Sequence, residues 1–499
     1  MNGFGLIAPE LILLFGGLIV FLLTVFEDKD EKGSGNGYVA ITTLWLLAAL
    51  VATFFQIKMA KDYFVANGAS QVAFTMMDVD AFAIFFKVTI LIGMVLVAVA
   101  GGTYMNSRTD HKGEFWSMFL FVTLAMSIAA SANNLVLLYI AIEFLSITSY
   151  ILAGFLRDDP RSAEAGLKYF LFGSVSSAVM LYGISLLYGA AGTLDLRAIG
   201  AAFAASDVMR PIIVPATLLT LVGFGFKMSL APFYQWAPDT YDGAPTPVTA
   251  YLSTASKAIG FAVTVRVFVV ALSVYIADWA PLLAGLSMLT MSMGNLIALR
   301  QTSIKRMLAY SSVAQAGYIL MGLAAVAAGS TSGMNGLNGV LIYIFAYLFT
   351  NVGAFLVVMV IEERLGSTDI TAYSGLSKRA PALAFMFTIF LLSLAGIPAT
   401  GGFMGKFYVF GAAIQRQYFW LAGVALINAG VAAYYYVNIV RVMFFASDEE
   451  TDRAPVTMPV SMSTVLVICT IFTLWIGLYP PNFIEWANTA AQQLLAVGF

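Results

Sequence analysis

Four ionisable side chains lie deep inside long apolar segments of this chain, where a charge is costly unless it has a partner. They are one carboxylate and three ammonium groups: Glu143, Lys227, Lys257 and Lys406. At the centre of a bilayer such a group costs at least about 2.5–3.5 kcal/mol, so each should face the bundle interior, a partner or water. Desolvation disfavours the charged form of such a group, and a nearby opposite charge favours it. Neighbouring groups can therefore change one another's proton affinity and pass protons from one to the next. We predict a proton relay without covalent catalysis; the alternative is a set of buried ion pairs that only fasten helices together.

Five further ionisable residues are weaker candidates. Lys87 and Arg266 lie close enough to the ends of apolar segments for their side chains to extend to the membrane surface. Glu10 lies in the first apolar segment, and the sequence leaves open whether these three residues are functional. Glu164 and Lys168 are four residues apart near the start of one segment, which is the spacing of an ion pair within a helix.

Two apolar segments carry helix breakers in their interior, each beside one of the buried lysines. The first, FKMSLAPFYQWAPD, contains Lys227, and the second, SLAGIPATGGFMGKF, contains Lys406. Proline removes a backbone hydrogen bond, and in a membrane the freed carbonyl is tolerated only where it is buried in protein or lines a water-filled cavity. Paired interrupted helices point to an inverted repeat and its transport site. The interrupting residues are Pro232, Pro238, Gly396, Pro398, Gly401 and Gly402.

The composition indicates that membrane helices hold these residues. Of the 499 residues, 60% are hydrophobic and 10% are charged, whereas soluble domains have about 25% charged residues. A backbone in lipid must satisfy its own hydrogen bonds, and the apolar runs are too long for barrel strands, so we expect an all-α polytopic membrane protein. A short interfacial helix is expected over 479–499. About fourteen transmembrane helices are expected, beginning near residues 5, 38, 80, 115, 133, 164, 211, 246, 278, 303, 335, 382, 417 and 458.

The two broken helices divide the chain into four expected parts. Two inverted repeats of five helices, over 115–273 and 278–445, would form two half-channels. An odd number of helices places the two copies in opposite orientations across the membrane. A three-helix segment over 1–114 precedes them, and the last transmembrane helix with its tail follows over 446–499.

The basic residues between the apolar segments indicate an orientation, because positively charged connections stay in the cytoplasm. Five fall on one side: Lys58, Lys61, Arg197, Arg210 and Arg416. Both termini are therefore predicted to be non-cytoplasmic, in a bacterial inner (plasma) membrane. The other side holds Lys29, Lys32, Arg108, Lys112, Arg157, Arg161, Arg300, Lys305, Arg306, Arg364, Lys378, Arg379, Arg441 and Arg453.

Other features exclude several kinds of site. The single cysteine, Cys469, cannot supply the several thiolates of an iron–sulfur cluster or a zinc site, and the single histidine, His111, lies in a polar connection. A net charge of −2 without a basic run argues against binding to nucleic acid. Apolar segments leave no room for a nucleotide-binding module. We therefore expect this chain to bind no cofactor and no metal.

Three stretches resemble the antiporter-like membrane subunits of respiratory complex I, the NADH:quinone oxidoreductase. They are FGFKMSLAPFYQWAPDTYDGAPTPVTAYLSTASKA (224–258), SIKRMLAYSSVAQAGY (303–318) and SLAGIPATGGFMGKFYVF (393–410). Within that family, Gly405-Lys406-Phe407 and the segments at 163–178 and 186–196 are most similar to subunit N. The resemblance implies a proton-pumping translocase subunit among other complex I membrane subunits. NADH, flavin, iron–sulfur clusters and quinone would be bound by other subunits.

The resemblance also implies roles by position. The family often has histidine where this chain has Tyr234 and Gln315, so these two side chains are expected to hold water and not to titrate near neutral pH. The acid and lysines of the family's proton path match Glu143, Lys227, Lys257 and Lys406, and Glu164 and Lys168 also fit its pattern.

Two other functions stay open. One is a subunit of a multi-subunit cation/proton antiporter, a homologous class that shares the broken helices and buried lysines. The other is a structural membrane spacer whose charges hold the bundle together and transmit nothing. The sequence does not distinguish ubiquinone, menaquinone and plastoquinone as the quinone of the complex.

Overall fold

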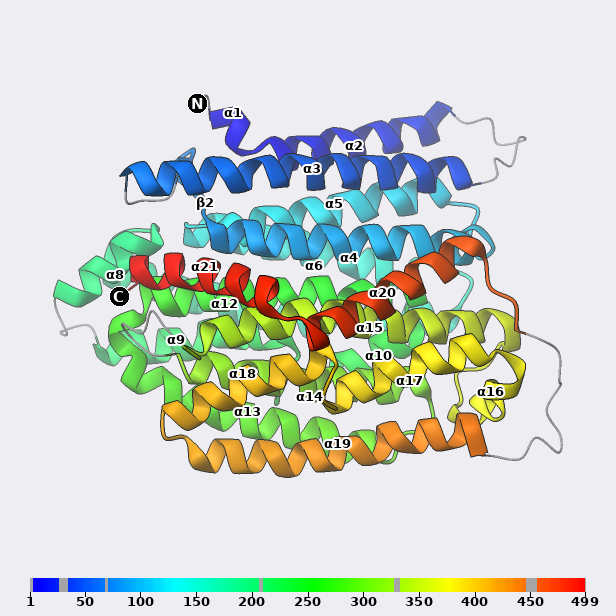
Figure 1. The fold of residues 1–499 in the computed structure, drawn as a ribbon. Coiled ribbons are helices and arrows are strands. Elements are labelled where there is room, and N and C mark those ends of the chain that lie inside the picture. Colours follow the sequence, from blue (N-terminus) through cyan, green and yellow to red (C-terminus); the bar gives the residue numbers. More distant parts are fainter. Residues whose placement is uncertain are drawn as a thin grey trace.

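Nearly all of the described chain is helical, and the helices lie side by side in one bundle (Figure 1). The computed structural model describes residues 3–26, 35–67, 71–205, 210–326, 333–445 and 456–498. Within these ranges thirteen helices are long and apolar enough to cross a membrane. Two shorter helices in series, α17 (Pro381–Ala395) and α18 (Gly401–Gln415), make a fourteenth crossing. The expected number of transmembrane helices is confirmed.

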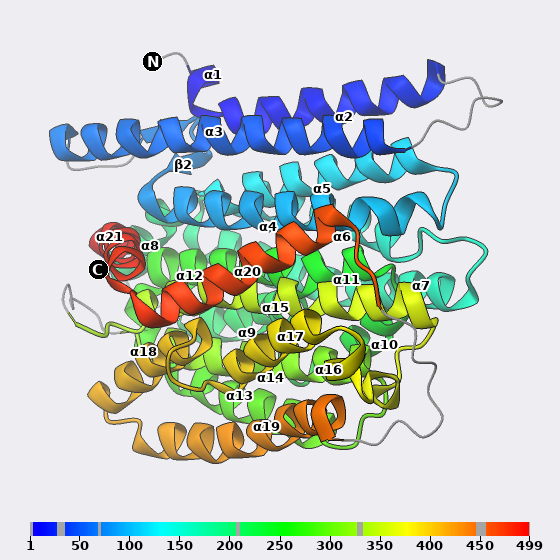
Figure 2. The ribbon, with the colours of Figure 1, turned by 45° about the vertical axis from the view of Figure 1, so that its right-hand side comes forward.

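The N-terminal part lies along the outer edge of the bundle, where α2 packs on α5 and α3 packs on α4 (Figure 2). A short antiparallel hairpin connects α3 to α4 and pairs Val72 with Asp78. This hairpin is the described exception to the all-helical prediction. The elements are α1 (Gly3–Leu6), α2 (Ala8–Phe26), α3 (Asn36–Asn67), β1 (Gln71–Ala73), β2 (Met77–Val79) and α4 (Ala81–Asn106).

Five crossings follow, and the fourth of them is interrupted. That crossing consists of α9 and α10, and the fifth contains two π-helical turns, η1 and η2. Helix α8 lies between the third and fourth crossings at one end of the bundle. The elements are α5 (Lys112–Ser131), α6 (Leu135–Ala153), α7 (Pro160–Ala191), α8 (Leu196–Ala205), α9 (Arg210–Met228), α10 (Trp236–Gly243), α11 (Thr246–Tyr251), η1 (Leu252–Ser256), α12 (Lys257–Arg266) and η2 (Val267–Ala271).

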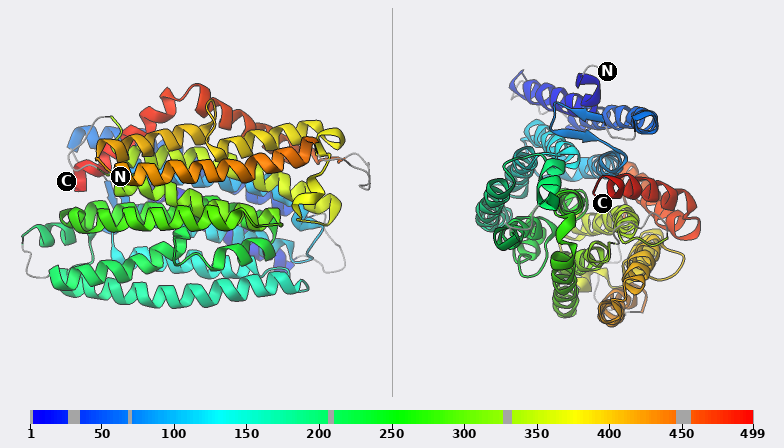
Figure 3. Two further views of the ribbon diagram at one scale, coloured as in Figure 1. Left: turned by 90° about the horizontal axis from the view of Figure 1, so that it is seen from below. Right: turned by 90° about the vertical axis from the view of Figure 1, so that its left-hand side faces the viewer.

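A second group of five crossings repeats this order, with the interruption again in the fourth, between α17 and α18. Seen end-on, the first group, coloured cyan to green, and the second group, coloured green to orange, lie beside each other (Figure 3). Helices α5 and α13 begin at opposite ends of the bundle, as inverted repeats require (Figure 1). The further elements are η3 (Ser273–Tyr275), α13 (Ile276–Ala298), α14 (Ile304–Ala324), α15 (Leu337–Leu365), η4 (Ile370–Tyr373), α16 (Leu376–Arg379) and α19 (Phe419–Phe445).

The helix interruptions are narrower than the sequence predicts. Pro232 lies between α9 and α10, but Pro238 is the third residue of α10, where a missing amide is tolerated. Gly396 and Pro398 lie between α17 and α18, whereas α18 begins with Gly401 and Gly402. Gly396 has φ +89°, a left-handed conformation that a glycine adopts without strain and that ends α17.

The chain ends with α20 (Val460–Leu478) and α21 (Pro481–Gly498), which cross the front of the bundle in Figure 1. Helix α21 buries a face of small and apolar residues, among them Ala487, Ala491 and Leu494, and packs on α4 and α15. A helix is therefore present where the short interfacial helix was expected. Its position at a membrane interface stays a prediction.

The described connections alternate between the two ends of the bundle, as the distribution of basic residues requires (Figure 1). Lys305 lies in the first turn of α14 with a side chain only 2% exposed, so it is buried at its end of the bundle. Lys29, Lys32 and Arg453 lie outside the described residues.

Candidate functional site

Lys227 lies at the interruption of the first group, one residue before the end of α9. Its side chain is buried, and its Nζ donates hydrogen bonds to Ser146 Oγ at 3.3 Å and to Tyr169 OH at 3.4 Å. The ammonium group also lies 5.9 Å from the centre of the Tyr169 ring. Two hydroxyl groups and one aromatic face therefore hold this lysine, all from neighbouring helices.

Glu143 lies on α6, one turn before Ser146. Its Oε1 accepts a hydrogen bond of 2.5 Å from Ser177 Oγ, which is itself 3.2 Å from Tyr139 OH. Glu143 and Lys227 form no direct ion pair, but both contact hydroxyl groups on α6 or α7. A hydroxyl can donate to one partner and accept from another, so both charges have groups beside them that can do either.

Lys257 is the first residue after the π-helical turn η1, and its side chain is buried. Its Nζ donates to Ser312 Oγ at 2.6 Å and to the Ser312 carbonyl at 2.8 Å, both on α14 of the second group. Single π-helical turns inside α-helices occur often at functional sites. Lys257 thus belongs to the first group in sequence and is bound by the second.

Gly260, one turn after Lys257, lies against the backbone of α9 at Lys227 and Met228. A Cβ atom at residue 260 would lie 3.2 Å from Met228 N and 3.3 Å from Lys227 C, closer than most real Cβ contacts. The absence of a side chain therefore allows the end of α9 to pack directly against α12.

Lys406 lies in the second turn of α18, and its side chain extends back to the interruption. Its Nζ donates to the carbonyls of Leu394 at 2.9 Å and Ala395 at 2.8 Å. In a continuous helix the Leu394 carbonyl would accept from the amide of residue 398, but Pro398 has none. Gly396 makes room for this contact, because a Cβ atom there would lie 2.7 Å from Lys406 Cδ.

The two residues that replace the family's histidines differ in their surroundings. Gln315 is buried, donates to the Leu394 carbonyl at 3.0 Å and accepts a hydrogen bond from Tyr343 OH. It therefore shares an acceptor with Lys406. Tyr234 lies in the first interruption with its ring 6.2 Å from that of Tyr310. That Gln315 and Tyr234 hold water stays a prediction.

Lys168 and Glu164 form the expected intrahelical ion pair, at 2.6 Å. The structure adds Asp239 on α10, whose carboxylate pairs with Lys168 at 2.7 Å and with Arg306 of α14 at 2.7 Å. This row of charges connects α7, the second half of the broken helix and α14. The sequence prediction missed Asp239 because this residue lies in a polar stretch and not inside a long apolar run.

Next to Arg306 in α14, Lys305 pairs with Glu362 of α15 at 3.0 Å. Thr246 of α11 and Tyr104 of α4 both donate to the same carboxylate. Consecutive residues of α14, Lys305 and Arg306, therefore bind two different acids and tie the two five-helix groups together at one end.

The three uncertain ionisable residues all have buried partners. Lys87 and Glu10 form an ion pair of 2.7 Å, and Ser127 Oγ donates to the same carboxylate at 2.7 Å. Arg266 binds Asp80 with two hydrogen bonds, of 2.8 and 3.0 Å. Neither cation extends to the membrane surface, so the expectation that they could do so is wrong.

The Arg266 pair belongs to a larger cluster at the hairpin. Asp78 contacts Arg266 at 3.4 Å and Arg197 of α8 at 2.7 Å. Burial raises the pKa of Asp78 to about 6, although the Arg266 guanidinium acts to lower it. The cluster fastens β2, α8 and α12 together and lies apart from the lysines at the helix interruptions.

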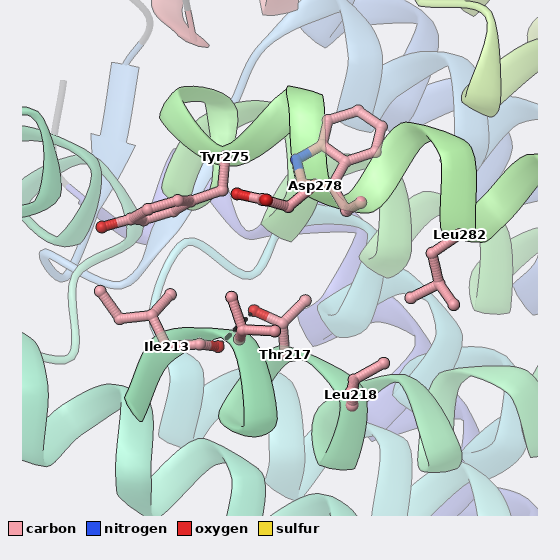
Figure 4. Close-up of a pocket in the computed structure, with 8 residues that line it drawn as sticks. Ile213, Thr217, Leu218, Tyr275, Asp278 and Leu282 are labelled. Atoms are coloured by element: carbon pink, nitrogen blue, oxygen red, sulfur yellow. Dashed lines mark hydrogen bonds between the residues drawn. The ribbon is translucent and has the colours of Figure 1, made fainter. Parts of the chain in front are cut away.

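A small groove lies between α9 and α13 (Figure 4). Its cavity volume is about 30 Å³, and its walls are formed by apolar side chains such as Ile213, Leu218 and Leu282. Asp278 at its edge pairs with Arg210 at 2.7 Å. The groove contains none of the buried lysines. In the described residues no cluster of three or more His, Cys, Asp or Glu side chains could hold a metal ion.

Comparison with known proteins shows similarity over almost the whole chain. Residues 132–432 match the protein family described as NADH:quinone oxidoreductase/Mrp antiporter, TM. NADH-quinone oxidoreductase subunit N of Heliobacterium modesticaldum is 39% identical over 98% of this chain and 99% of its own length. F(420)H(2) dehydrogenase subunit N of Methanosarcina mazei is 40% identical over 98% of both chains.

Solved structures share the fold. A chain of respiratory complex I from Thermus thermophilus is 30% identical, with a TM-score of 0.77 over 96% of this chain and 98% of that one. A chain of the Mrp complex from Dietzia sp. DQ12-45-1b is 21% identical, with a TM-score of 0.85 over 99% of this chain and 97% of that one. At that identity the second likeness concerns the fold alone.

Proposed function

The chain belongs to the family of antiporter-like membrane subunits found in NADH:quinone oxidoreductase and Mrp antiporters, and we propose that it translocates protons as subunit N of a complex I. It is a multi-pass membrane protein. In the proposed complex, other subunits oxidise NADH and reduce quinone, and they hold the flavin and iron–sulfur clusters. This chain contributes a path for protons and no redox step.

The observation that carries the proposal is a series of charged groups across both five-helix groups, of which the three lysines are buried and Glu143 is half-buried. Glu143 and Lys227 each contact hydroxyls of α6 or α7, the backbone at Lys227 lies against the helix that holds Lys257, and Lys257 is bound by α14. Lys406 ends the series at the second interruption. In a structural spacer, these lysines would hold helices together through ion pairs. In the part of the chain that the structure describes, none of the three lysine Nζ atoms has a carboxylate oxygen within 4.0 Å.

The physical basis of the relay is coupling between neighbouring charges. At an effective dielectric constant of about 20, a unit charge about 8 Å away changes the energy of another by about 2 kcal/mol, which is more than a tenfold change in protonation. A change of charge at Glu143 thus alters the protonation of Lys227, and the change passes to Lys257 and Lys406. Ordered water, together with the hydroxyl groups beside Lys227 and Lys257, carries the protons.

The partners in this proposal are the other membrane subunits of complex I, including antiporter-like paralogues. The membrane is the bacterial inner membrane, with both termini on the non-cytoplasmic side, as the basic connections favour. A relative that is 40% identical is named as a subunit of an F(420)H(2) dehydrogenase. In the proposal, the partner subunits therefore determine which electron donor the complex oxidises.

The test is purification of the tagged chain in mild detergent, with mass spectrometry of its partners and an NADH:quinone activity assay on the same particle. Co-purification of NADH-binding, flavin and iron–sulfur subunits, with quinone reduction, is the expected result. Recovery of small membrane subunits alone, without redox activity but with cation-dependent proton flux, would replace the proposal by a cation/proton antiporter. An active F(420)H(2)-oxidising particle would change the electron donor and leave the proton path in place.

A further inference from the structure

Two consecutive buried serines of α14, Ser311 and Ser312, lie between the last two lysines of the series. Ser312 accepts both hydrogen bonds of the Lys257 ammonium group, one at Oγ and one at its carbonyl. These are the hydrogen bonds of Lys257 among the described residues. The position of this ammonium group therefore depends on one residue of the opposite five-helix group.

Ser311 begins a second series of contacts, which leads to Lys406. Its Oγ lies 2.5 Å from Tyr436 OH on α19. Gln315 Nε2 donates to Tyr436 OH at 3.3 Å and to the Leu394 carbonyl at 3.0 Å, and Lys406 donates to that same carbonyl. Because Tyr436 accepts from Gln315, its own hydroxyl proton is available to Ser311.

Buried hydroxyl groups around Ser312 favour water at this point. Tyr241 and Tyr347 place their hydroxyls near it, and both side chains are at most 5% exposed. Neither hydroxyl completes a hydrogen bond within the described part of the chain. Buried polar groups nearly always find a partner, and ordered water supplies one where the protein does not.

We propose that Ser311 and Ser312 are positioning residues of the proton path and form the junction between its two halves. This inference rests on the proposed function. Ser312 holds the Lys257 end, and Ser311 holds the Lys406 end through Tyr436 and Gln315. Neither residue is part of the series of charges that the sequence predicts.

The chemistry of a hydroxyl group explains why serine suits this junction. Towards an ammonium group the Ser312 oxygen acts as an acceptor, and towards a neutral amine the same hydroxyl donates its proton. Its orientation therefore follows the protonation state of Lys257. A turn of this hydroxyl changes the partner offered to neighbouring water, with no net gain or loss of a proton by the serine.

The experiment compares two variants of equal size in the complete complex in proteoliposomes: Ser312→Thr, which keeps a hydroxyl, and Ser312→Val, which removes it. Protons translocated per NADH oxidised are measured from pH 6 to pH 9, a range that spans about three decades of proton concentration around neutrality. We expect the valine variant to lose most of its pumping and to shift the pH profile of what remains, and the threonine variant to retain both. The pair Ser311→Thr and Ser311→Val should differ in the same direction.

The control is Ser287→Ala, which removes a buried serine hydroxyl that donates to the Gly317 carbonyl at 2.6 Å, away from the lysines. NADH:quinone oxidation by each variant reports assembly. Equal pumping and equal pH profiles for the threonine and valine variants would overturn the junction, even if both are reduced, because size alone would then explain the loss. If Lys257→Met pumps normally, the proposed function itself fails; if Lys257→Met fails to pump and Ser312→Val is normal, only the serine inference fails.

Discussion

Lys406 binds the backbone carbonyl that Pro398 leaves without an amide donor. The carbonyl belongs to Leu394, four residues before the proline, and the Lys406 Nζ lies 2.9 Å from it. The helix interruption and the lysine are therefore parts of one arrangement, in which the break creates the acceptor that the charge needs.

Replacing Pro398 with alanine should restore a donor to the Leu394 carbonyl and weaken its bond to Lys406. A hydrogen bond to a charged group contributes about 1.5–3 kcal/mol, so NADH-driven proton pumping should fall by roughly tenfold or more. The measurement is quenching of a pH-sensitive dye by proteoliposomes that contain the complex. Pro215→Ala is the matched control, because Pro215 is an exposed proline inside α9. Wild-type pumping by Pro398→Ala would contradict the arrangement.

Lys257→Met should abolish pumping with assembly intact. Methionine has a similar length but carries no charge, and it removes both hydrogen bonds to Ser312. We expect a loss of about tenfold or more in pumping, equivalent to at least 1.4 kcal/mol in the relay. Quinone reduction by the uncoupled complex reports assembly, and Lys61→Met, at an exposed position of α3, is the control. A relay that still pumps without Lys257 is incompatible with the proposed path.

Glu143→Gln separates charge from hydrogen bonding at the start of the path. Glutamine still offers an oxygen to Ser177 but loses the charge that acts on Lys227. Pumping should therefore fall more in Glu143→Gln than in Ser177→Ala, by about tenfold if the lost coupling is near 1.4 kcal/mol. Glu114→Gln, a partly exposed residue that contacts His111, serves as the control. The reverse order of the two effects would show that the hydrogen bond matters more than the charge.

Asp80→Ala should disrupt folding and not the proton path. The substitution leaves the buried Arg266 with its longer contacts to Asp78 and to the Ala130 carbonyl, and breaking a buried ion pair typically costs about 3–5 kcal/mol. The yield of complex and its thermal unfolding midpoint should both fall. The double variant Asp80→Ala with Arg266→Met should recover part of this loss, because no unpaired charge remains. Normal stability of Asp80→Ala alone would contradict a structural role for the pair.

The stability of the folded chain should depend on pH through Asp78, which lies in the hairpin. Burial raises its pKa to about 6, above its ordinary value of 3.8, so the folded chain binds a proton that the unfolded chain has released between these values. Its contribution to stability is therefore present below about pH 4, falls as the pH rises and is lost above about pH 6. The measurement is the thermal unfolding midpoint of the detergent-solubilised complex. The midpoint of Asp78→Asn should rise relative to that of the wild type between about pH 4.5 and pH 7, where Asp78 loses its proton in the folded chain. Asp62→Asn at the exposed end of α3 should show no such difference, and parallel curves for both variants would refute this effect.

Much of the fold was predictable because membrane helices leave a strong signal of length and hydropathy. The hairpin at Gln71–Val79 was not, because its strands of three residues are too short to show an alternating pattern. Pro238 was assigned to the break because proline usually interrupts helices, but in the first turn its missing amide has no helical acceptor to lose. The sequence therefore located the breaks and overestimated their width.

The charged members of the site were predictable, and their uncharged partners were not. A lysine in an apolar run is conspicuous, whereas serine is common in membrane helices and often bonds its own backbone, as Ser149 does with the Leu145 carbonyl. Ser312 has the same sequence appearance and a different partner. Only the hydrogen bonds from Lys257 identify it, and this information is absent from local sequence patterns.

The acceptors of Lys406 are main-chain carbonyls, so they do not depend on which side chains residues 394 and 395 carry. Evolution can exchange those side chains, and most of the lipid-facing surface, without altering the groups that hold the ammonium. The lysine, the imino acid at 398 and the glycine at 396 each contribute directly to this contact. Such an arrangement allows the surrounding sequence to diverge widely among relatives while the local chemistry stays the same.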